Sequence, residues 1–283
     1  MNAGSLDNSI SVNAGANTCR SLGRLDRREA LGGMMRMDVV VPAWRAGKPG
    51  QFALLQAEGS DCFLGRALSV CGQSGETVSF LVAPIGKGTR ELCGLPEQSP
   101  VWVLGPLGNG FDVEALIAGP GRLLLVGGGV GIAPFPLLID TLADGGRKLE
   151  VVMLAGFRDA EQARGGEVLE RAVAGAAKAG LNCRYEKVVE DGSAGPAERV
   201  TDLLARHLRP GDRVAVCGPD AMAKAVWQQC TAAGVVGVWF SLETNMACGV
   251  GSCHGCVVAL ADGSYARVCR EGPVFAGLEV FGG

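Results

Sequence analysis

The stretch Leu123–Pro134 reads LLLVGGGVGIAP, and it decides the fold of the region that follows it. Four apolar residues predict a buried strand, the glycines predict a tight turn, and a helix is expected over 133–142. Further strands are predicted at 149–155, 182–188 and 213–217, with helices at 166–179, 197–207 and 220–233. This alternation of strand and helix predicts a doubly wound parallel α/β sheet with helices on both faces.

The residues before this stretch follow a different pattern. Short apolar or alternating segments, separated by glycine and proline, predict strands at 35–41, 51–56, 68–71, 77–82 and 101–104. They are typical of a small antiparallel β-barrel. From residue 238 the chain becomes cysteine-rich and ends in small strands. The expected organisation is a flexible extension (1–16), a β-barrel (17–117), an α/β domain (118–237) and a cysteine module (238–283).

Composition excludes several classes of protein. Hydrophobic residues make up 48% of the 283 and charged residues 19%, enough to bury a sizeable core. The net charge of −3, without a lysine or arginine block, argues against nucleic acid as a partner. The apolar runs are too short to cross a bilayer. Eleven cysteines without a signal peptide favour a reducing, cytoplasmic location and metal or redox use of the thiols.

Four of the cysteines form the most specific motif in the chain. Cys248, Cys253, Cys256 and Cys269 follow the C-x4-C-x2-C…C spacing of plant-type [2Fe–2S] ligation. Glycines between them permit a tight loop whose backbone N–H groups point at the sulfurs. The alternatives are a structural zinc site or unliganded buried cysteines. Zinc modules usually contain two C-x2-C-like pairs, and this segment contains one.

Two loops of the α/β region are candidates for binding a nicotinamide dinucleotide. The glycine turn after the first strand would let the backbone approach a pyrophosphate at a helix N-terminus, although tight strand–helix packing would give the same pattern. The loop that begins at Cys217 ends a later strand of the same sheet and should face the same crevice, unless it is an ordinary turn. A cysteine there could contact the nicotinamide ring. The predicted residues are Gly127, Gly128, Gly129, Val130, Gly131, Ala133, Pro134, Cys217, Gly218, Pro219 and Asp220.

Two further stretches, both in the barrel, could together hold a second pyrophosphate. Arg66–Ser69 places an arginine before an alternating strand, and Gly86–Thr89 is a glycine turn that ends in threonine. For the arginine alone, the alternative is a solvated surface charge.

No acid–base triad is seen, since the chain has only two histidines. His207 is expected at a helix end, as a solvated or capping residue. His254 lies between two predicted cluster ligands, where it would tune the cluster, meet a partner, or simply be exposed on a loop. No catalytic side chain is therefore predicted, and a redox relay through cofactors is expected instead.

Taken in order, these motifs resemble the ferredoxin-reductase superfamily and, within it, the electron-transfer subunits of type B dihydroorotate dehydrogenase. The resemblance spans about residues 18–283. It is carried by Arg66–Ser69, Gly86–Thr89, Leu104–Phe111 (LGPLGNGF), Gly127–Pro134, Cys217–Asp220, Ser241–Cys256 and Cys269–Phe275 (CREGPVF).

The resemblance implies that the barrel binds FAD, with Arg66 on its phosphates and Ser69 near the isoalloxazine. The implied FAD residues are Arg66, Ala67, Leu68, Ser69, Leu81, Val82, Ala83, Gly88 and Thr89. Two positions depart from the family pattern: Ala67 stands where proline is usual, and Ala83 stands where an arginine is usual. Without the positive charge of that arginine, FAD should bind more weakly, or Arg66 and Lys87 should take over its contacts with FAD.

The resemblance also implies an oxidoreductase subunit of pyrimidine biosynthesis. Electrons would pass from NADH through FAD and a [2Fe–2S] cluster to a partner that carries FMN and the dihydroorotate site, in a heterotetramer of two of each subunit. A flavin is needed because hydride carries two electrons and the cluster accepts one. NADH is expected rather than NADPH, although Arg158 could be a 2′-phosphate ligand, since NADH-using relatives carry a similar Gly-Phe-Arg.

Three other functions stay open at this point. The chain could be the small subunit of an NADH-dependent ferredoxin:NADP oxidoreductase or of a sulfide-dehydrogenase-like complex. Those proteins often have aspartate at the first cluster position, where this chain has Cys248. It could also be a stand-alone reductase with its own acceptor, or a zinc-containing binding module without a redox role.

Overall fold

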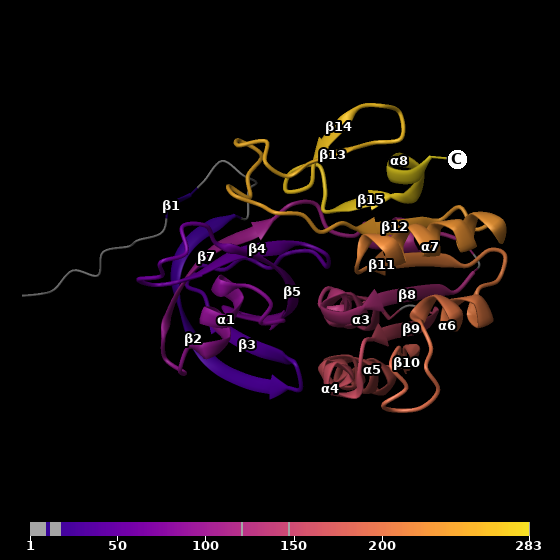
Figure 1. Ribbon diagram of the computed structural model, residues 1–283, viewed down its shortest axis with the longest axis horizontal. Coiled ribbons are helices and arrows are strands. Elements are labelled where there is room, and N and C mark those ends of the chain that lie inside the picture. Colours follow the sequence, from indigo (N-terminus) through magenta and orange to yellow (C-terminus); the bar gives the residue numbers. More distant parts are fainter. Residues whose placement is uncertain (1–9, 12–17, 120, 147, 283) are drawn as a thin grey trace, which may run out of the picture.

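The structure, a computed structural model, describes residues 10–11, 18–119, 121–146 and 148–282. Figure 1 shows a barrel beside an α/β domain, with a smaller module that lies along the top of both. The predicted fold class is confirmed: an antiparallel barrel, a doubly wound α/β domain and a C-terminal module. Among the described residues, no helix is both long enough and apolar enough to span a membrane.

The barrel is a closed antiparallel sheet. Its strands are β2 (Cys19–Leu31), β3 (Met34–Val40), β4 (Phe52–Ala57), β5 (Arg66–Ser74), β6 (Thr77–Val82) and β7 (Pro100–Leu107). They pair in the order β2-β3-β6-β5-β4-β7, and β7 pairs again with β2, which closes the sheet. Alternate residues such as Leu25, Val39 and Phe80 fill the interior. Cys71 of β5 and Leu81 of β6 belong instead to the core that contains α3 and α5, so these two strands face the α/β domain.

Three barrel elements were not predicted. β2 was not predicted because its exposed positions carry charged residues such as Arg24, Asp26 and Arg28. These charges obscure the alternating burial of Ser21 and Leu25 on the other side of the strand. α1 (Lys87–Gly94) and α2 (Val113–Ile117) are short helices in a region expected to be all-β. Of the segment 1–16, expected to be flexible, only 10–11 is among the described residues; it forms β1 (Ile10–Ser11), paired with β2. The rest of that prediction lies outside them.

The α/β domain is a six-stranded sheet in the order β10-β9-β8-β11-β12-β15. Its parallel strands are β8 (Leu123–Gly128), β9 (Glu150–Phe157), β10 (Asn182–Val189), β11 (Arg213–Cys217) and β12 (Val238–Ser241). The helical elements are η1 (Gly129–Ile132), α3 (Phe135–Asp144), α4 (Ala160–Ala163), η2 (Arg164–Gly166), α5 (Glu167–Lys178), α6 (Val200–His207) and α7 (Asp220–Ala232).

Side chains alternate between the two faces of this sheet, because successive strand residues point to opposite sides. Leu123 and Leu125 of β8 pack with α3 and α5, on the side turned to the barrel. Leu124 and Val126 pack with α6 and α7 on the other side. Two hydrophobic cores therefore hold the sheet, and all parallel strands present their carboxyl ends along one edge.

The cysteine segment is inserted between two strands of this sheet. β12 pairs with β11, and β15 (Val274–Ala276) returns antiparallel to β12, with Ser241 opposite Val274. Between them lie the cysteine loop and a hairpin of β13 (Val257–Ala259) and β14 (Tyr265–Arg267); the chain then continues into α8 (Gly277–Phe281). From the sequence, the cysteine module is predicted to start at residue 238. In the structure, β12 begins at this residue and extends the sheet of the α/β domain.

The turn between β2 and β3 joins the barrel to the α/β domain. Leu31 and Met34 flank this turn, are 1% and 4% exposed, and belong to the same hydrophobic core as α3 and α5. On β2, Glu29 accepts two hydrogen bonds from Arg171 of α5, at 2.7 and 2.5 Å. The β2–β3 hairpin of the barrel is therefore part of the hydrophobic core of the α/β domain.

Candidate flavin, nicotinamide and cluster sites

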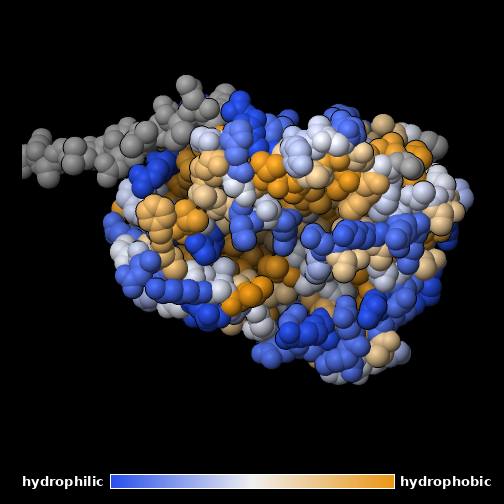
Figure 2. All heavy atoms as spheres, turned by 45° about the horizontal axis from the view of Figure 1, so that its top comes forward, coloured by the Kyte–Doolittle hydropathy of each residue, from blue (hydrophilic) through white to orange (hydrophobic). Residues whose placement is uncertain are grey.

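A cavity of about 520 Å³ lies where the three parts of the molecule meet. The barrel contributes Phe52, Arg66–Ser69, Leu81, Ala83, Ile85, Gly86 and Thr89, and the glycine loop contributes Val130 and Ala133. The end of β12 and the segment after it contribute Ser241–Met246, and Pro273 completes the wall. Figure 2 shows hydrophobic surface, in orange, gathered around a hollow between the two domains. Its mixed apolar and polar walls suit a ring system that carries a charged tail.

Arg66 fits the phosphates of FAD. Its Nε atom is buried and has no hydrogen-bond partner, while its terminal nitrogen donates to the Leu64 carbonyl at 2.6 Å. A Cβ on Gly88 would lie 3.0–3.2 Å from the Arg66 side chain, so the glycine makes room for the guanidinium beside the first turn of α1. A buried N–H without a hydrogen-bond partner costs free energy, so the Arg66 Nε–H is suited to donate to an anionic oxygen such as that of a phosphate.

The other predicted FAD residues are distributed unevenly. Ala67, Leu68, Ser69, Leu81, Ala83 and Thr89 line the cavity with Arg66. The Val82 side chain instead packs inside the barrel, since neighbouring residues of β6 point to opposite sides. Lys87, the other candidate to replace the missing arginine, is exposed and lies 3.9 Å from Asp61.

The two dinucleotide loops lie against each other. A Cβ on Gly131 would meet the Cys217 carbonyl oxygen at 2.5 Å, and one on Gly128 would meet the Met222 sulfur at 2.6 Å. Gly131 is therefore required by backbone packing between the loops, whereas Gly128 lies against the flexible side chain of Met222 in α7. Gly129, at φ +56°, faces open space instead. Val130 and Ala133, at the start of the following helical segment, line the flavin cavity, so the loops also reach the place where a dinucleotide would meet FAD.

Glu243 was missed by the sequence reading. It lies on the cavity wall, and its Oε1 is 3.9 Å from the Cys217 sulfur. Loss of hydration raises the pKa of both groups, and Asp220 raises that of Glu243 further. Its position at the carboxyl end of β12 was the available signal, because this end adjoins that of β11, which Cys217 terminates.

The four module cysteines lie as two pairs. The Cys253 thiol contacts Cys248, and the Cys256 thiol contacts Cys269. Each sulfur accepts a backbone N–H: Cys248 from Cys253 and Cys256 from Cys269, each at 3.4 Å, Cys253 from Gly255 at 3.4 Å, and Cys269 from Gly251 at 3.1 Å. Donors aimed at sulfur favour thiolates, as an iron–sulfur cluster requires.

The paired arrangement matches the ligand pattern of a [2Fe–2S] cluster. A tetrahedral zinc needs four ligands around one point, whereas a [2Fe–2S] cluster takes two protein ligands on each iron.

One apolar cluster links the flavin cavity to the cysteines. Phe52 lines the cavity and belongs to the same buried cluster as Leu54, Cys256 and Cys269. A Cβ on Gly249 would lie 2.8–2.9 Å from Leu107 and Leu54, so the cysteine loop packs directly on the barrel. The two candidate sites therefore share a dry wall.

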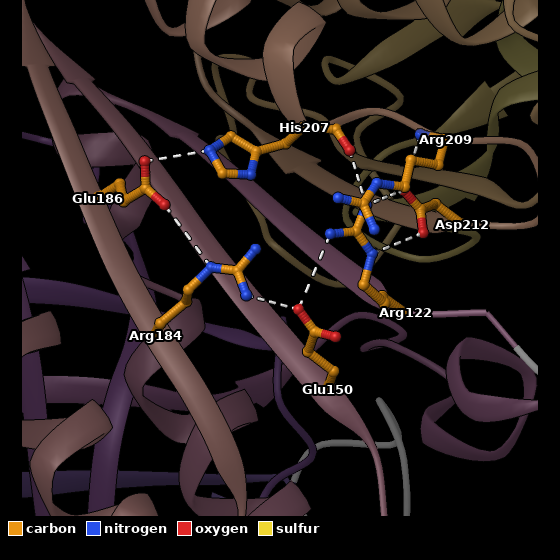
Figure 3. Close-up of polar contacts among 7 residues, drawn as sticks. All are labelled: Arg122, Glu150, Arg184, Glu186, His207, Arg209 and Asp212. Carbon is orange, nitrogen blue, oxygen red and sulfur yellow. Dashed lines mark hydrogen bonds and ion pairs between the residues drawn. The ribbon is translucent and has the colours of Figure 1, made fainter.

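The two histidines lie outside this cavity. His254, between Cys253 and Cys256, is exposed and adopts a φ of +56°. His207 ends α6, and its Nε2 is 3.0 Å from a Glu186 oxygen. It belongs to a network of ion pairs and hydrogen bonds with Arg122, Glu150, Arg184, Glu186, Arg209 and Asp212 (Figure 3). The network connects Arg122, Glu150 and Asp212, at the starts of β8, β9 and β11, with β10 and the end of α6.

A larger hollow, of about 770 Å³, lies between residues 47–49 and 108–113. It contains none of the predicted site residues.

Comparison with protein families gives two matches. Residues 243–281 match the iron–sulfur cluster binding domain of dihydroorotate dehydrogenase B. Residues 125–228 match an oxidoreductase NAD-binding domain. These ranges contain the cysteine loop and both dinucleotide loops.

Similar proteins were found in sequence and in structure. The electron transfer subunit of dihydroorotate dehydrogenase B (NAD(+)) from Clostridium perfringens is 36% identical over 82% of this chain and 86% of its own length. The corresponding subunit from Geobacillus thermodenitrificans is 38% identical over the same shares. A structure of an NADH-dependent reduced ferredoxin-NADP oxidoreductase has a TM-score of 0.75 and 26% identity, covering 92% of this chain and 90% of that one.

Proposed function

The chain belongs to the family of electron-transfer subunits of dihydroorotate dehydrogenase B, and on that premise we propose which of its residues carry the electrons and to what partner. It is an oxidoreductase subunit whose cofactors are NAD(H), FAD and a [2Fe–2S] cluster. The ferredoxin-NADP oxidoreductase alternative has a similar fold but lower identity, 26% against 36–38%.

The observation that carries the assignment of residues is the shared wall between the cavity and the cysteines. Phe52 faces the cavity and packs in one apolar cluster with Cys256 and Cys269. The flavin and the cluster supply the conversion of a two-electron hydride into single electrons. The protein's own task is to hold both groups close together and to keep water from the space between them.

The barrel residues would hold FAD. Arg66 offers its unpaired Nε to the phosphates, assisted by the N–H groups of Gly88 and Thr89 in the first turn of α1. Ser69, Leu81 and the other predicted barrel residues would line the ring. Val82 would take part only through its backbone.

The loops of the α/β domain would hold the dinucleotide. Gly127–Gly131 would carry the pyrophosphate at the start of the following helical turns, with Ala133 and Pro134 behind it. Cys217–Asp220 would lie along the nicotinamide. Burial raises the pKa of Cys217 well above its ordinary value, so this residue would meet the nicotinamide as a neutral thiol.

Cys248, Cys253, Cys256 and Cys269 would hold the irons, two cysteines to each iron. Membership of the family implies a catalytic partner subunit. We propose that this partner carries FMN and the dihydroorotate site, that two of each subunit form a heterotetramer, and that the complex is cytoplasmic. Exposed Cys253 and His254 support an electron exit on this side of the module.

Cys256→Ser tests the order of the relay. The purified variant should lose the visible absorption of the cluster, while NADH should still reduce its flavin in a stopped-flow experiment. Transfer to the catalytic subunit should fall to background. Cys62→Ser, a cysteine outside the quartet, is the control and should keep all three properties. Loss of flavin reduction together with the cluster, in a variant that unfolds like the parent, would refute the order.

A further inference from the structure

The direction in which the dinucleotide lies follows from the order of the strands. On the function proposed above, the pyrophosphate lies at the carboxyl end of β8 and the nicotinamide lies toward Cys217 at the end of β11, beside the flavin cavity. β9 and β10 lie on the other side of β8. The adenosine half must therefore extend over the carboxyl ends of β9 and β10.

Two loops at that place are bonded together. β9 ends at Phe157 and is followed by Arg158, while β10 ends at Val189 and is followed by 190–193. The N–H of Asp191 donates to the Arg158 carbonyl at 3.1 Å, and the N–H of Ala160 donates to the Ser193 hydroxyl at 2.8 Å. These bonds hold the two loops together and bring the backbones of Arg158 and Asp191 side by side.

Arg158 is the residue that would be expected to bind the 2′-phosphate of NADPH, since an arginine near this strand end accommodates that group. Its side chain is 76% exposed, but its Nε lies 3.2 Å from the Asp159 carboxylate. Asp159 is fixed, because its other oxygen accepts the N–H of Gln162 at 2.8 Å and caps α4.

Asp191 is the second carboxylate near Arg158, after Asp159. Its Oδ1 accepts both the N–H and the hydroxyl of Ser193, at 2.9 and 2.6 Å, so the carboxylate is held in a tight turn. These bonds lower the pKa of Asp191, and the positive charge of Arg158 lowers it further. Asp191 is therefore ionised at neutral pH.

We propose that Asp191, together with Asp159, determines the preference for NADH by neutralising Arg158 at the adenosine end of the dinucleotide site. Two carboxylates against one guanidinium leave an excess negative charge. That charge repels a 2′-phosphate but accepts a hydrogen bond from the ribose hydroxyl of NADH. An arginine at the strand end is thereby compatible with NADH specificity.

Asp191→Asn tests this proposal in the FAD-loaded protein. The amide oxygen of asparagine can keep both bonds from Ser193, so the turn is preserved while the charge is removed. For NADPH, kcat/KM for flavin reduction should rise about fivefold to tenfold, mainly through a lower KM, and the gain should shrink at high salt. For NADH, it should change less than about twofold.

Asp262→Asn is the matched control. Asp262 accepts the N–H of Ser264 at 2.8 Å in a similar exposed Asp-x-Ser turn, but it lies in the β13–β14 hairpin, so the coenzyme ratio should not move. In the double variant R158A/D191N, the gain with NADPH should vanish.

A coenzyme ratio in Asp191→Asn equal to that of the parent overturns the proposal, and so does a gain that survives in the double variant. A parent that prefers NADPH refutes it while leaving the proposed function intact. A parent whose flavin neither coenzyme reduces refutes the function itself.

Discussion

Replacing Gly32 by alanine should loosen the contact between the barrel and the α/β domain. Gly32 lies in the β2–β3 turn at φ +60°, and a Cβ there would fall 1.8 Å from the carbonyl oxygen of Glu161. That oxygen belongs to the backbone of α4 and cannot rotate away. Either the hairpin or α4 must move, which withdraws Leu31 and Met34 from the core that they share with α5.

The expected loss of stability has two parts. A left-handed backbone at a residue with a Cβ costs about 1–2 kcal/mol. Overpacking against a rigid neighbour costs about 1–3 kcal/mol. Together they predict that the free energy of unfolding falls by roughly 2–5 kcal/mol.

Urea unfolding of the FAD-loaded protein, followed by circular dichroism and flavin fluorescence, measures this loss. Gly33→Ala is the matched control in the same turn: its Cβ would lie 3.4 Å from the Gln162 side chain, an ordinary contact, and its φ is not left-handed. Its effect should stay within about 0.5 kcal/mol. Equal stability of the two variants would refute the reasoning.

Two further variants test the cofactor site and the ion pair at the domain interface. Arg66→Ala should weaken FAD binding by about 10- to 150-fold, because one charge-assisted hydrogen bond to the phosphates is lost. Fluorescence titration measures the Kd, and Arg24→Ala, on the exposed surface, is the control. A Kd for Arg66→Ala equal to that of the control would contradict the phosphate role. Glu29→Gln should lower the free energy of unfolding by about 0.5–1 kcal/mol at pH 7, since Arg171 lowers the pKa of Glu29 from its ordinary 4.5. Because a depressed pKa stabilises the fold above the unfolded value, this difference should be complete above pH 4.5 and fade as the pH falls through the folded pKa; a difference that persists at lower pH would mean that the charge is not its source.

The sequence predicted elements well where burial left a clear pattern. β6 and β11 have the predicted bounds, because their apolar runs are short and sharply ended. β2 was not recognised, since its outward residues are charged. β12 and β15 are so short that only their pairing with β11 and with each other reveals the sheet they belong to.

The candidate site divides in the same way. The cysteine spacing is local, so the sequence alone could point to all four thiols. Glu243 depends on β12 lying next to β11, which is a property of the sheet and not of any motif. The unpaired Nε of Arg66 likewise depends on Gly88, more than twenty positions away.

The pairing of Ser241 with Val274 places both ends of the intervening segment side by side on adjacent strands. In topological terms, residues 242–273 are an insertion between two paired strands. A tight hairpin turn could connect Ser241 to Val274 and leave the remaining strand order unchanged. The strand order of the nucleotide-binding sheet therefore does not depend on the cluster segment, whereas the flavin cavity does, because residues 242–246 and Pro273 form part of its wall.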